Sequence, residues 1–450
     1  MKSALTARYG EERLPRYTSY PTAPHFSNSV GEDSYRGWLD AISPRQTASL
    51  YVHVPFCRSM CWYCGCHTSV TRREEPIAVY AAALRCEIDL VAKAIPHRAR
   101  VAHIHFGGGT PTIMAPELFT DLIESLRSSF FVLAGSEIAV EIDPRTLTLP
   151  MIDAMGYGGV SRVSLGVQSF DPAVQRAINR IQSFEQTATA ADGLRKAGVN
   201  AINFDLIYGL PHQTVESCVQ TARKCVVLAP DRLSVFGYAH VPSFKRHQRK
   251  IAEASLPDTL ERHRQSEAIA DTLQEAGYVR IGLDHFALPH DPLVAAQRNG
   301  VLHRNFQGYS DDCGDVLLGF GASSIGRLAQ GYVQNIVPTR DYLDRIATGR
   351  MATAKGYALT SDDQFRAEII ERIMCDFAVD LDDVCRRHGR GREALSSDMA
   401  RLSSLTSDGV ATMKNGKLKV ADDARFLVRT VASTFDAYIG RSKAVHSRAV

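Results

Sequence analysis

Strand-like and helix-like segments alternate six times between residues 46 and 256. Each strand-like segment is a short apolar run rich in β-branched residues, and each is followed by a stretch that can form a helix, such as 77–94 or 116–129. Strands that alternate with helices in this way predict a parallel sheet. The six predicted strands are 49–54, 101–106, 137–142, 161–167, 200–207 and 232–236.

Each of the six predicted strands ends in a string of chemically useful residues. In chain order these strings are a cysteine-rich loop, GGGTPT at 107–112, EIDP at 141–144, LGVQ at 165–168, DLIYGLP at 205–211 and FGYAH at 236–240. Active sites of α/β barrels gather at the carboxyl ends of the strands. We therefore expect these six ends to meet around one site.

The cysteine-rich loop follows the first strand and carries Cys57, Cys61, Cys64 and Cys66. The C-x3-C-x2-C spacing of the first three can place three thiolates on an iron–sulfur cluster and leave one iron open. A structural zinc site, with Cys66 or His67 as fourth ligand, and a disulfide pair are the alternatives. Zinc usually draws ligands from two separated pairs, and no second C-x2-C or H-x3-H follows, so the spacing favours the cluster.

Strings along nearly the whole chain resemble one family. They are PRYTSYPT at 15–22, YVHVPFCRSMCWYCGC at 51–66, HFGGGTPT at 105–112, DLIYGLP at 205–211, DHFA at 284–287 and HRNFQGY at 303–309. The cysteine motif resembles that of radical S-adenosylmethionine enzymes. The wider set, above all its first and last strings, resembles the oxygen-independent coproporphyrinogen III oxidases.

The resemblance and the six units together predict an α/β fold, a partial (β/α)6 radical S-adenosylmethionine barrel with additions at both ends. We expect an N-terminal arm over the active site at 1–44, the barrel at 45–256 and an extension covering its mouth at 257–355. The remaining residues, 356–450, predict a mostly helical, winged-helix-like domain with a hairpin at 409–420 that turns at Asn415-Gly416. Its acidic and basic residues are interleaved, which favours packing over DNA binding.

The resemblance implies a [4Fe-4S] cluster and S-adenosylmethionine, with two molecules of the latter expected. Cys57, Cys61 and Cys64 are the predicted cluster ligands. The glycines after the second strand lack the Lys-Ser/Thr of a phosphate loop, and we expect them to let the backbone approach the cofactor. The predicted cofactor residues are Tyr51, Tyr63, Gly108, Gly109, Thr110, Glu141, Gln168, Arg180, Asp205, Ala239 and Ile325. For any single carboxylate among them, an ordinary salt bridge at a strand end is the alternative.

Four residues are predicted to take part in catalysis: Tyr51, His53, Cys66 and Arg16. Tyr51 and His53 share one face of the first strand, since side chains two apart point the same way. A core histidine with a backbone partner is an equal alternative for His53. We expect Cys66 to lie beside the cluster without binding it.

The implied substrate, coproporphyrinogen III, is a flexible tetrapyrrole with four propionates. The implied reaction converts two of them to vinyl groups, when a 5′-deoxyadenosyl radical takes a β-hydrogen, carbon dioxide leaves and an electron passes on. The electron donor and acceptor are unidentified. Candidate propionate ligands are Arg16, Tyr17, Tyr20, His303 and Arg304. The rival interpretations are a heme chaperone without decarboxylase activity and a radical methyltransferase that opens heme.

Composition narrows the possible partners and location. The chain has 52 basic and 49 acidic side chains and a formal charge of +3, which does not favour a nucleic-acid partner. No apolar run approaches the roughly 20 residues that cross a bilayer. We expect a cytoplasmic monomer with no membrane partner, in a compartment where thiols stay reduced. The basic run 245–250 is interpreted as a solvated face.

Overall fold

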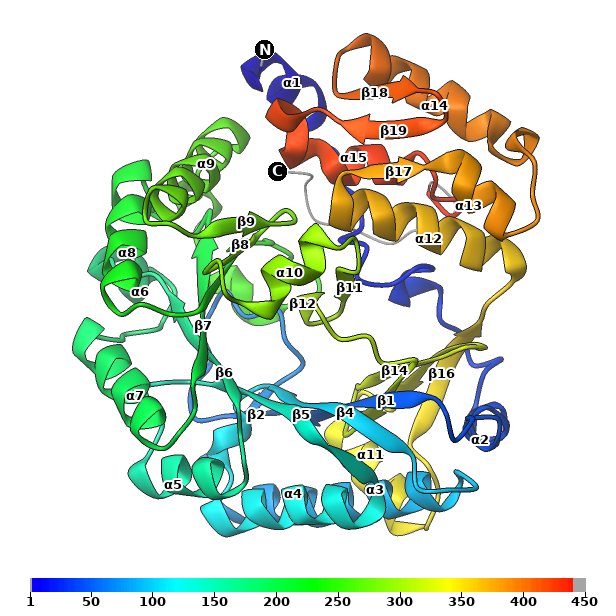
Figure 1. Cartoon of the computed structure of the whole chain (residues 1–450). Helices are drawn as coiled ribbons and strands as arrows, with labels where there is room; N and C mark the ends of the chain where they lie inside the picture. Colours follow the sequence, from blue (N-terminus) through cyan, green and yellow to red (C-terminus); the bar gives the residue numbers. More distant parts are fainter. Residues whose placement is uncertain (1, 440–450) are drawn as a thin grey trace.

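A curved sheet of twelve strands forms the centre of the computed structural model, which describes residues 2–439 (Figure 1). The six predicted strands are all present, pair with one another in chain order and run parallel. This confirms the predicted strand–helix alternation. The strands are β1 (Thr47–Val54), β4 (Arg100–Gly108), β5 (Phe131–Ile142), β6 (Arg162–Gln168), β7 (Ala201–Tyr208) and β8 (Arg232–Gly237).

Helices cover the outer face of this sheet and leave its inner face to the site (Figure 1). On β1 the side chains of Leu50, Val52 and Val54 are fully buried among the helices' apolar faces, while Tyr51 and His53 point the other way. The alternation therefore separates core residues from site residues within one strand. The covering helices are α3 (Glu75–Lys93), α4 (Pro116–Ser129), α5 (Leu149–Tyr157), α6 (Pro172–Ala177), α7 (Phe184–Lys196), α8 (Val215–Val227) and α9 (Thr259–Glu275).

Much of the segment 257–355 belongs to the same sheet. On one edge β13 (Val316–Phe320) runs parallel to β1, and β14 (Ile325–Leu328), β15 (Gly331–Asn335) and β16 (Thr353–Ala358) follow antiparallel. On the other edge lie β10 (His285–Ala287) and β9 (Val279–Ile281). The segment also holds α10 (Pro292–Arg298), α11 (Thr339–Ala347) and the hairpin of β11 (His303–Asn305) with β12 (Gly308–Ser310).

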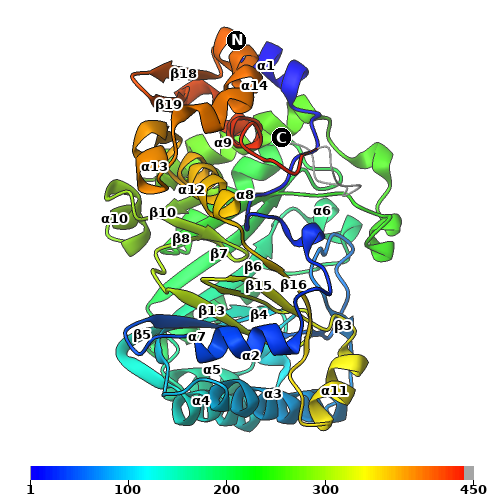
Figure 2. The same cartoon turned by 90° about the vertical axis from the view of Figure 1, so that its right-hand side faces the viewer.

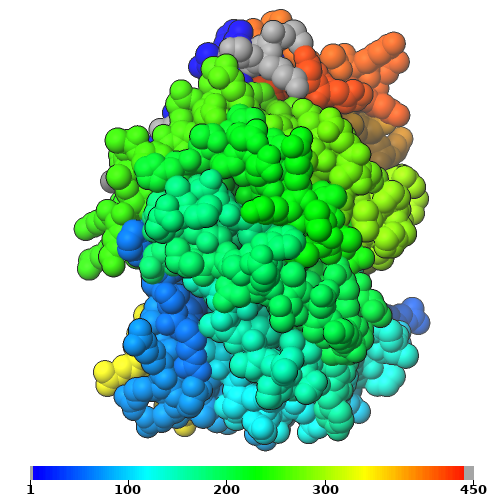
Figure 3. Space-filling model, turned by 90° about the vertical axis from the view of Figure 1, so that its left-hand side faces the viewer, coloured from blue at the N-terminus to red at the C-terminus, as the bar shows by residue number. Residues whose placement is uncertain are grey.

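The C-terminal part forms a small domain with its own apolar core at one end of the barrel (Figures 2 and 3). Its three-stranded sheet has the order β17-β19-β18, and its hairpin turns at Asn415 and Gly416, whose φ angles of 49° and 77° suit the predicted Asn-Gly turn. Residues 440–450 of the predicted domain lie outside the described residues. The elements are α12 (Ser361–Asp376), β17 (Ala378–Asp380), α13 (Leu381–Arg387), α14 (Ser396–Ser407), β18 (Ala411–Lys414), β19 (Lys417–Val420) and α15 (Val428–Ser433).

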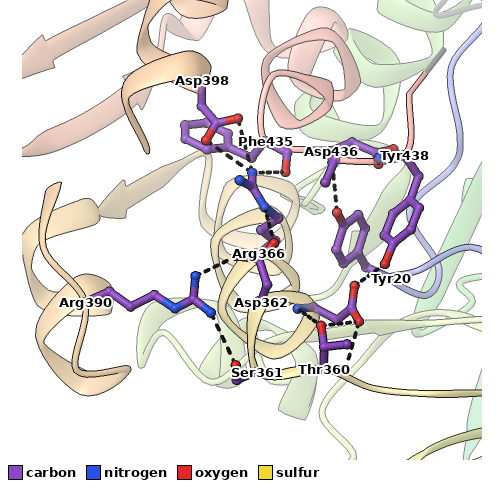
Figure 4. A network of polar contacts seen from close by, with 12 residues as sticks. Tyr20, Thr360, Ser361, Asp362, Arg366, Arg390, Asp398, Phe435, Asp436 and Tyr438 are labelled. Atoms are coloured by element: carbon purple, nitrogen blue, oxygen red, sulfur yellow. Dashed lines mark hydrogen bonds and ion pairs between the residues drawn. The ribbon is translucent and has the colours of Figure 1, made fainter. Parts of the chain in front are cut away.

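The N-terminal arm packs against this C-terminal domain. It begins with α1 (Lys2–Tyr9), and Tyr17 and Tyr20 are buried in the apolar core of the domain. Tyr17 donates a hydrogen bond to Asp436, and the Tyr20 hydroxyl accepts one from the amide of Ala437. Figure 4 shows Tyr20 beside Asp436 and Tyr438 of the C-terminal domain. The arm then leads through α2 (Glu32–Asp40) to β1. None of the helices formed by residues 2–439 is long and apolar enough to cross a membrane.

A buried carboxylate ties α3 to the added strands. Glu87 accepts hydrogen bonds from the Gly321 amide, the Asn335 side chain and the Tyr342 hydroxyl. Burial outweighs these contacts and raises the pKa of Glu87 from 4.5 to about 7. Between these two pH values the folded protein keeps a proton that the unfolded chain has lost, so the free energy of unfolding must fall as pH rises.

We therefore expect Glu87→Gln to remove this part of the pH dependence. Urea unfolding of both proteins from about pH 4.5 to 7 checks it, because the difference in unfolding free energy isolates residue 87 from the other titrating groups. The wild type should lose stability relative to the variant as pH rises. A difference that stays constant over this window would contradict the assignment.

Candidate active site

A cavity of about 580 Å³ opens at the carboxyl ends of the six parallel strands. The cysteine loop, the glycine string after β4 and residues that follow β5 to β8 line it together, and Arg16 of the arm also reaches it. The predicted meeting of the six strand ends is thus confirmed. Short β2 (Phe56–Cys57) and β3 (Ser69–Val70) pair within the cysteine loop.

The basic segment 245–250 fixes the backbone of the cysteine loop. Lys245 donates to the carbonyl of Cys66 at 2.9 Å, His247 to that of Cys64 at 2.7 Å and Gln248 to that of Tyr63 at 3.0 Å. Its interpretation as a merely solvated face is wrong, since these side chains satisfy carbonyls that no helix or sheet would pair.

Polar side chains contact two of the three thiols of the C-x3-C-x2-C motif. The hydroxyls of Thr68 and Thr110 approach the Cys57 sulfur at 3.3 and 3.5 Å. The guanidinium groups of Arg145 and Arg180 approach the Cys61 sulfur at 3.4 and 3.5 Å. Burial raises the pKa of Cys57, and the hydrogen bonds from the two hydroxyls oppose this only in part.

Cys66 also lines the cavity and contacts Cys64. The hydrogen bond with Cys64, followed by the charge of Cys64, raises the pKa of Cys66 well above its usual value. The same hydrogen bond lowers the pKa of Cys64 to about 7. Within the described residues, no three His, Cys, Asp or Glu side chains converge on a point as ligands of one ion. Thiols spaced around a cavity suit a cluster, which binds each thiolate at a different iron.

Glu141, at the end of β5, is held as a carboxylate. His105 donates to it at 3.1 Å and so does the amide of Gly108. Burial opposes ionisation, but these contacts outweigh it and lower the pKa of Glu141. The ionised oxygens face the cavity and can accept from an ammonium or a hydroxyl.

The glycines after β4 are required by packing against the protein itself. A Cβ at Gly108, whose φ is 110°, would lie 2.6 Å from the His53 ring. One at Gly109 would lie 2.5 Å from the carbonyl of Phe56. The cysteine loop and the first strand therefore approach these glycines closely. The predicted approach of their backbone to the cofactor stays a prediction.

Polar side chains on β6 and β7 complete the cavity wall. Asp205 accepts from Ser164 and Asn203, both at 2.8 Å, and burial raises its pKa. Buried polar atoms without a hydrogen-bond partner in the described structure include Gln168 Oε1 and Arg180 Nε. Because unsatisfied buried groups are rare, both point to a polar ligand in the cavity. This fits S-adenosylmethionine, which carries ammonium, carboxylate, hydroxyl and adenine groups.

Comparisons with known proteins match this geometry. Residues 51–225 match the model of the Radical SAM superfamily. The chain is 61% identical over all 450 residues to the oxygen-independent coproporphyrinogen III oxidase of Bradyrhizobium diazoefficiens, covering 100% of both chains. This chain belongs to the oxygen-independent coproporphyrinogen III oxidases. The resemblance seen in the motifs is therefore confirmed.

Two further comparisons agree with the family. The Escherichia coli K12 oxygen-independent coproporphyrinogen III oxidase is 39% identical over 433 residues, 96% of this chain and 94% of the relative. The solved structure titled "Coproporphyrinogen III oxidase (HemN) from Escherichia coli is a Radical SAM enzyme" superposes with a TM-score of 0.90 at 37% identity, covering 95% of this chain and 100% of that one. The predicted fold class is confirmed. The relatives are named as oxidases, which supports this interpretation over the heme chaperone.

Most of the predicted catalytic, cofactor and cluster residues line the central cavity. Three do not: Tyr51, His53 and Ile325. His53 is buried behind Gly108, and its Nε2 donates to the carbonyl of His67 at 3.0 Å, as in the core-histidine alternative. Burial lowers the pKa of His53 to about 4. The Tyr51 hydroxyl hydrogen-bonds to His53, and its ring stacks on His105, one layer behind Glu141. Ile325 begins β14, beyond β13, and does not line the cavity.

The predicted propionate ligands separate into two groups. Arg16 reaches the cavity and donates to the carbonyl of Gly237 at 3.1 Å. Tyr17 and Tyr20 instead anchor the arm to the C-terminal domain, so their assignment as propionate ligands is wrong. His303 pairs with Glu371 at 3.0 Å, outside the central cavity, whereas Arg304 lies beside Asp284.

Sequence reasoning missed an ion-pair cluster beside the cysteine loop. Asp143 binds Arg145 at 2.6 Å and Arg180 at 3.4 Å, and both arginines contact the Cys61 sulfur. Although burial opposes it, the two positive charges lower the pKa of Asp143. The signal was present, since Asp143 and Arg145 follow Glu141 directly in the chain.

Proposed function

We propose that this chain converts coproporphyrinogen III to protoporphyrinogen IX without oxygen, by oxidative decarboxylation of two propionates to vinyl groups. The observation that carries the proposal is the single cavity that brings together the three thiols, the polar strand ends and Arg16 of the arm. The similarity to named oxidases over the full chain supports the same reaction.

We assign the cluster to Cys57, Cys61 and Cys64. The S-adenosylmethionine site is assigned to residues of the cavity wall, and a second molecule is part of the proposal because the cavity is large. When bound there, a reduced [4Fe-4S] cluster and S-adenosylmethionine would supply a 5′-deoxyadenosyl radical able to abstract hydrogen from a propionate. The proposed cofactor residues are Tyr63, Gly108, Gly109, Thr110, Glu141, Gln168, Arg180, Asp205 and Ala239.

The side chains of the chain position the reactants. Glu141 and Asp205 offer acceptors for the ammonium and hydroxyl groups of the cofactor, and Gln168 offers an amide oxygen without a partner. Cys66 lies on the cavity wall beside Cys64 and is proposed as a catalytic residue that does not bind the cluster. Arg16 closes the cavity from the arm side and excludes water from radical chemistry. Tyr51 and His53 act from behind the wall, as positioning residues for His105 and Gly108.

The reaction needs two electron partners. One donor must reduce the cluster, and one acceptor must take the electron that each decarboxylation leaves after hydrogen and carbon dioxide depart. A monomer is part of the proposal. Unpaired thiols at all ten cysteines fit a reducing compartment, and we propose the cytoplasm.

Alanine at Glu141, Arg180 or Asp205 is expected to weaken S-adenosylmethionine binding while the cluster stays intact. Loss of one charge-assisted hydrogen bond costs about 1.5 to 3 kcal/mol, or roughly ten- to hundredfold in affinity. Equilibrium binding of S-adenosylmethionine and iron analysis check both parts. Arg195→Ala, on the outer helix α7, is the matched control. Unchanged affinity in all three variants would refute the assignment to the cofactor. It would support the alternative that these residues form ordinary salt bridges at strand ends.

Anaerobic reconstitution tests the proposed function. Purified protein is supplied with iron, sulfide, S-adenosylmethionine, a low-potential reductant and coproporphyrinogen III, and the products are separated by chromatography. The proposal requires a product with two vinyl groups that depends on S-adenosylmethionine. Binding of heme without vinyl formation would support the chaperone instead.

A further inference from the structure

A second, smaller pocket opens beside the central cavity, where the arm, the β11–β12 hairpin and α15 meet. Its volume is about 70 Å³, enough for a carboxylate and a methylene but not for a tetrapyrrole ring. Arg16, Phe236, Gly237 and Tyr238 line both spaces, so the two are contiguous. A group that enters the small pocket can remain attached to a body in the large one.

The small pocket is strongly positive. The guanidinium groups of Arg16, Arg304 and Arg429 line it, together with those of Arg262 and Arg280. Among its described lining residues Asp284 is the sole carboxylate. It accepts from His285 at 2.8 Å and lies 3.7 Å from Arg304. Arg280 pairs with Glu267 at 3.2 Å, outside the pocket lining. Arg16 and Arg304 both interact with Asp284, so an additional anion beside these two guanidinium groups would meet complementary charge.

Contacts with its neighbours fix the position of Arg304, but one of its hydrogen-bond donors has no partner in the described structure. Its guanidinium stacks on the Tyr309 ring at 4.5 Å, and its Nε donates to the carbonyl of Arg16 at 3.3 Å. Its side chain is 5% exposed, and its Nη1 is buried without a hydrogen-bond partner in the described structure. A fixed, buried and unsatisfied donor is the feature expected of an anion site before its ligand binds.

Repulsion between the arginines supports the same conclusion. Burial, followed by the charge of Arg16, lowers the pKa of Arg429 to about 10. Burial and the charge of Arg304 also lower the pKa of Arg16, despite the attraction of Asp284. A second negative charge would relieve both effects.

We propose that Arg16, Arg304 and Arg429 bind the carboxylate of a propionate that does not react, and so fix the orientation of the tetrapyrrole in the central cavity. This rests on the proposed function. No residue of the cysteine loop lines the small pocket, so a propionate held there stays apart from the reacting position. The C-terminal domain contributes Arg429 from α15, which makes it part of the substrate site.

The test measures binding of coproporphyrin III, the stable oxidised form, to cluster-free protein by fluorescence. We expect Arg304→Gln and Arg429→Gln to bind it about ten- to hundredfold more weakly. Arg340→Gln is the matched control, because this arginine on α11 is 92% exposed and should change affinity less than about twofold. The tetramethyl ester of the same porphyrin should bind the wild type as weakly as the acid binds the variants.

The ester separates ligand contact from a structural effect. Arg429 also donates to the carbonyl of Leu14 at 3.4 Å, so its loss affects the arm. A purely structural role would weaken acid and ester equally, and that result would overturn the proposal. Arg304→Lys and Arg429→Lys should prefer the acid over the ester more than the Gln variants do. Lysine keeps the positive charge but lacks the planar guanidinium that can bind a carboxylate through two hydrogen bonds.

Failure of this proposal can be told apart from failure of the proposed function. If the wild type forms vinyl product while both Gln variants keep the wild-type KM and acid affinity, the pocket assignment is wrong and the function stands. If the wild type forms no vinyl product but acid binding still depends on Arg304 and Arg429, the carboxylate site stands and the reaction is wrong.

Discussion

Replacing Cys57, Cys61 or Cys64 singly with Ser is expected to abolish the [4Fe-4S] cluster and all product formation. Each thiolate binds a different iron, so a site with three protein ligands cannot lose one and hold the cube. Anaerobic iron and sulfide analysis after reconstitution, with the visible absorption spectrum, measures the outcome. Iron content should fall from about four per chain to near zero.

Cys66→Ser tests the distinction between ligand and neighbour. We expect its iron content to remain near that of the wild type and its product formation to fall, because Cys66 contacts Cys64 without serving as a ligand in our assignment. Cys313→Ser is the control, since Cys313 is exposed and is not one of the residues that line the cavity. Equal loss of iron in the four loop variants would refute the three-ligand assignment.

Arg16→Ala is expected to reduce vinyl formation by at least about tenfold, while the cluster and reductive cleavage of S-adenosylmethionine persist. Arg16 lines the central cavity and the small arginine pocket, so its loss both opens the cavity to water and removes a carboxylate ligand. Arg8→Ala is the matched control on the same arm, because Arg8 pairs with Asp408 at the surface. The two activities are measured as vinyl product and as 5′-deoxyadenosine.

Deletion of residues 1–25 should have the same effect on product and a further effect on stability. It removes Leu5, Tyr9, Tyr17 and Tyr20 from the core of the C-terminal domain and exposes apolar surface there. A truncated protein that forms vinyl product at the full-length rate would refute the role of the arm. It would also reopen the chaperone interpretation.

The barrel could be predicted because its strands are strongly patterned. Each of the six parallel strands is an apolar run that is followed by a helix, and the chemistry lies directly after it in the chain. The added strands carry weaker signals: β16 has the sequence TAKGYA and β15 has GYVQN, which contain too few apolar residues to reveal a strand. Their place in the sheet depends on pairing with a barrel that forms from residues far away.

Site residues near strand ends were predictable, whereas contacts between distant segments were not. Glu141 and Asp205 follow from the position of their strands. Tyr17 pairs with Asp436, 419 residues away, and no local pattern indicates this. Arg429 was missed for the same reason, since it lies in a C-terminal helix that composition alone assigns to packing. Tyr51 and His53 were placed on the correct inner face, but the glycine string of β4 stands between His53 and the cavity.

Transfer of hydrogen from the substrate tests the central claim most directly. Coproporphyrinogen III carrying deuterium at the β-carbons of its propionates is incubated anaerobically with reconstituted protein, S-adenosylmethionine and reductant. We predict that deuterium appears in 5′-deoxyadenosine and that one carbon dioxide is released for each vinyl group formed. Vinyl product without deuterium in 5′-deoxyadenosine, or 5′-deoxyadenosine without any vinyl product from the wild type, would contradict the account.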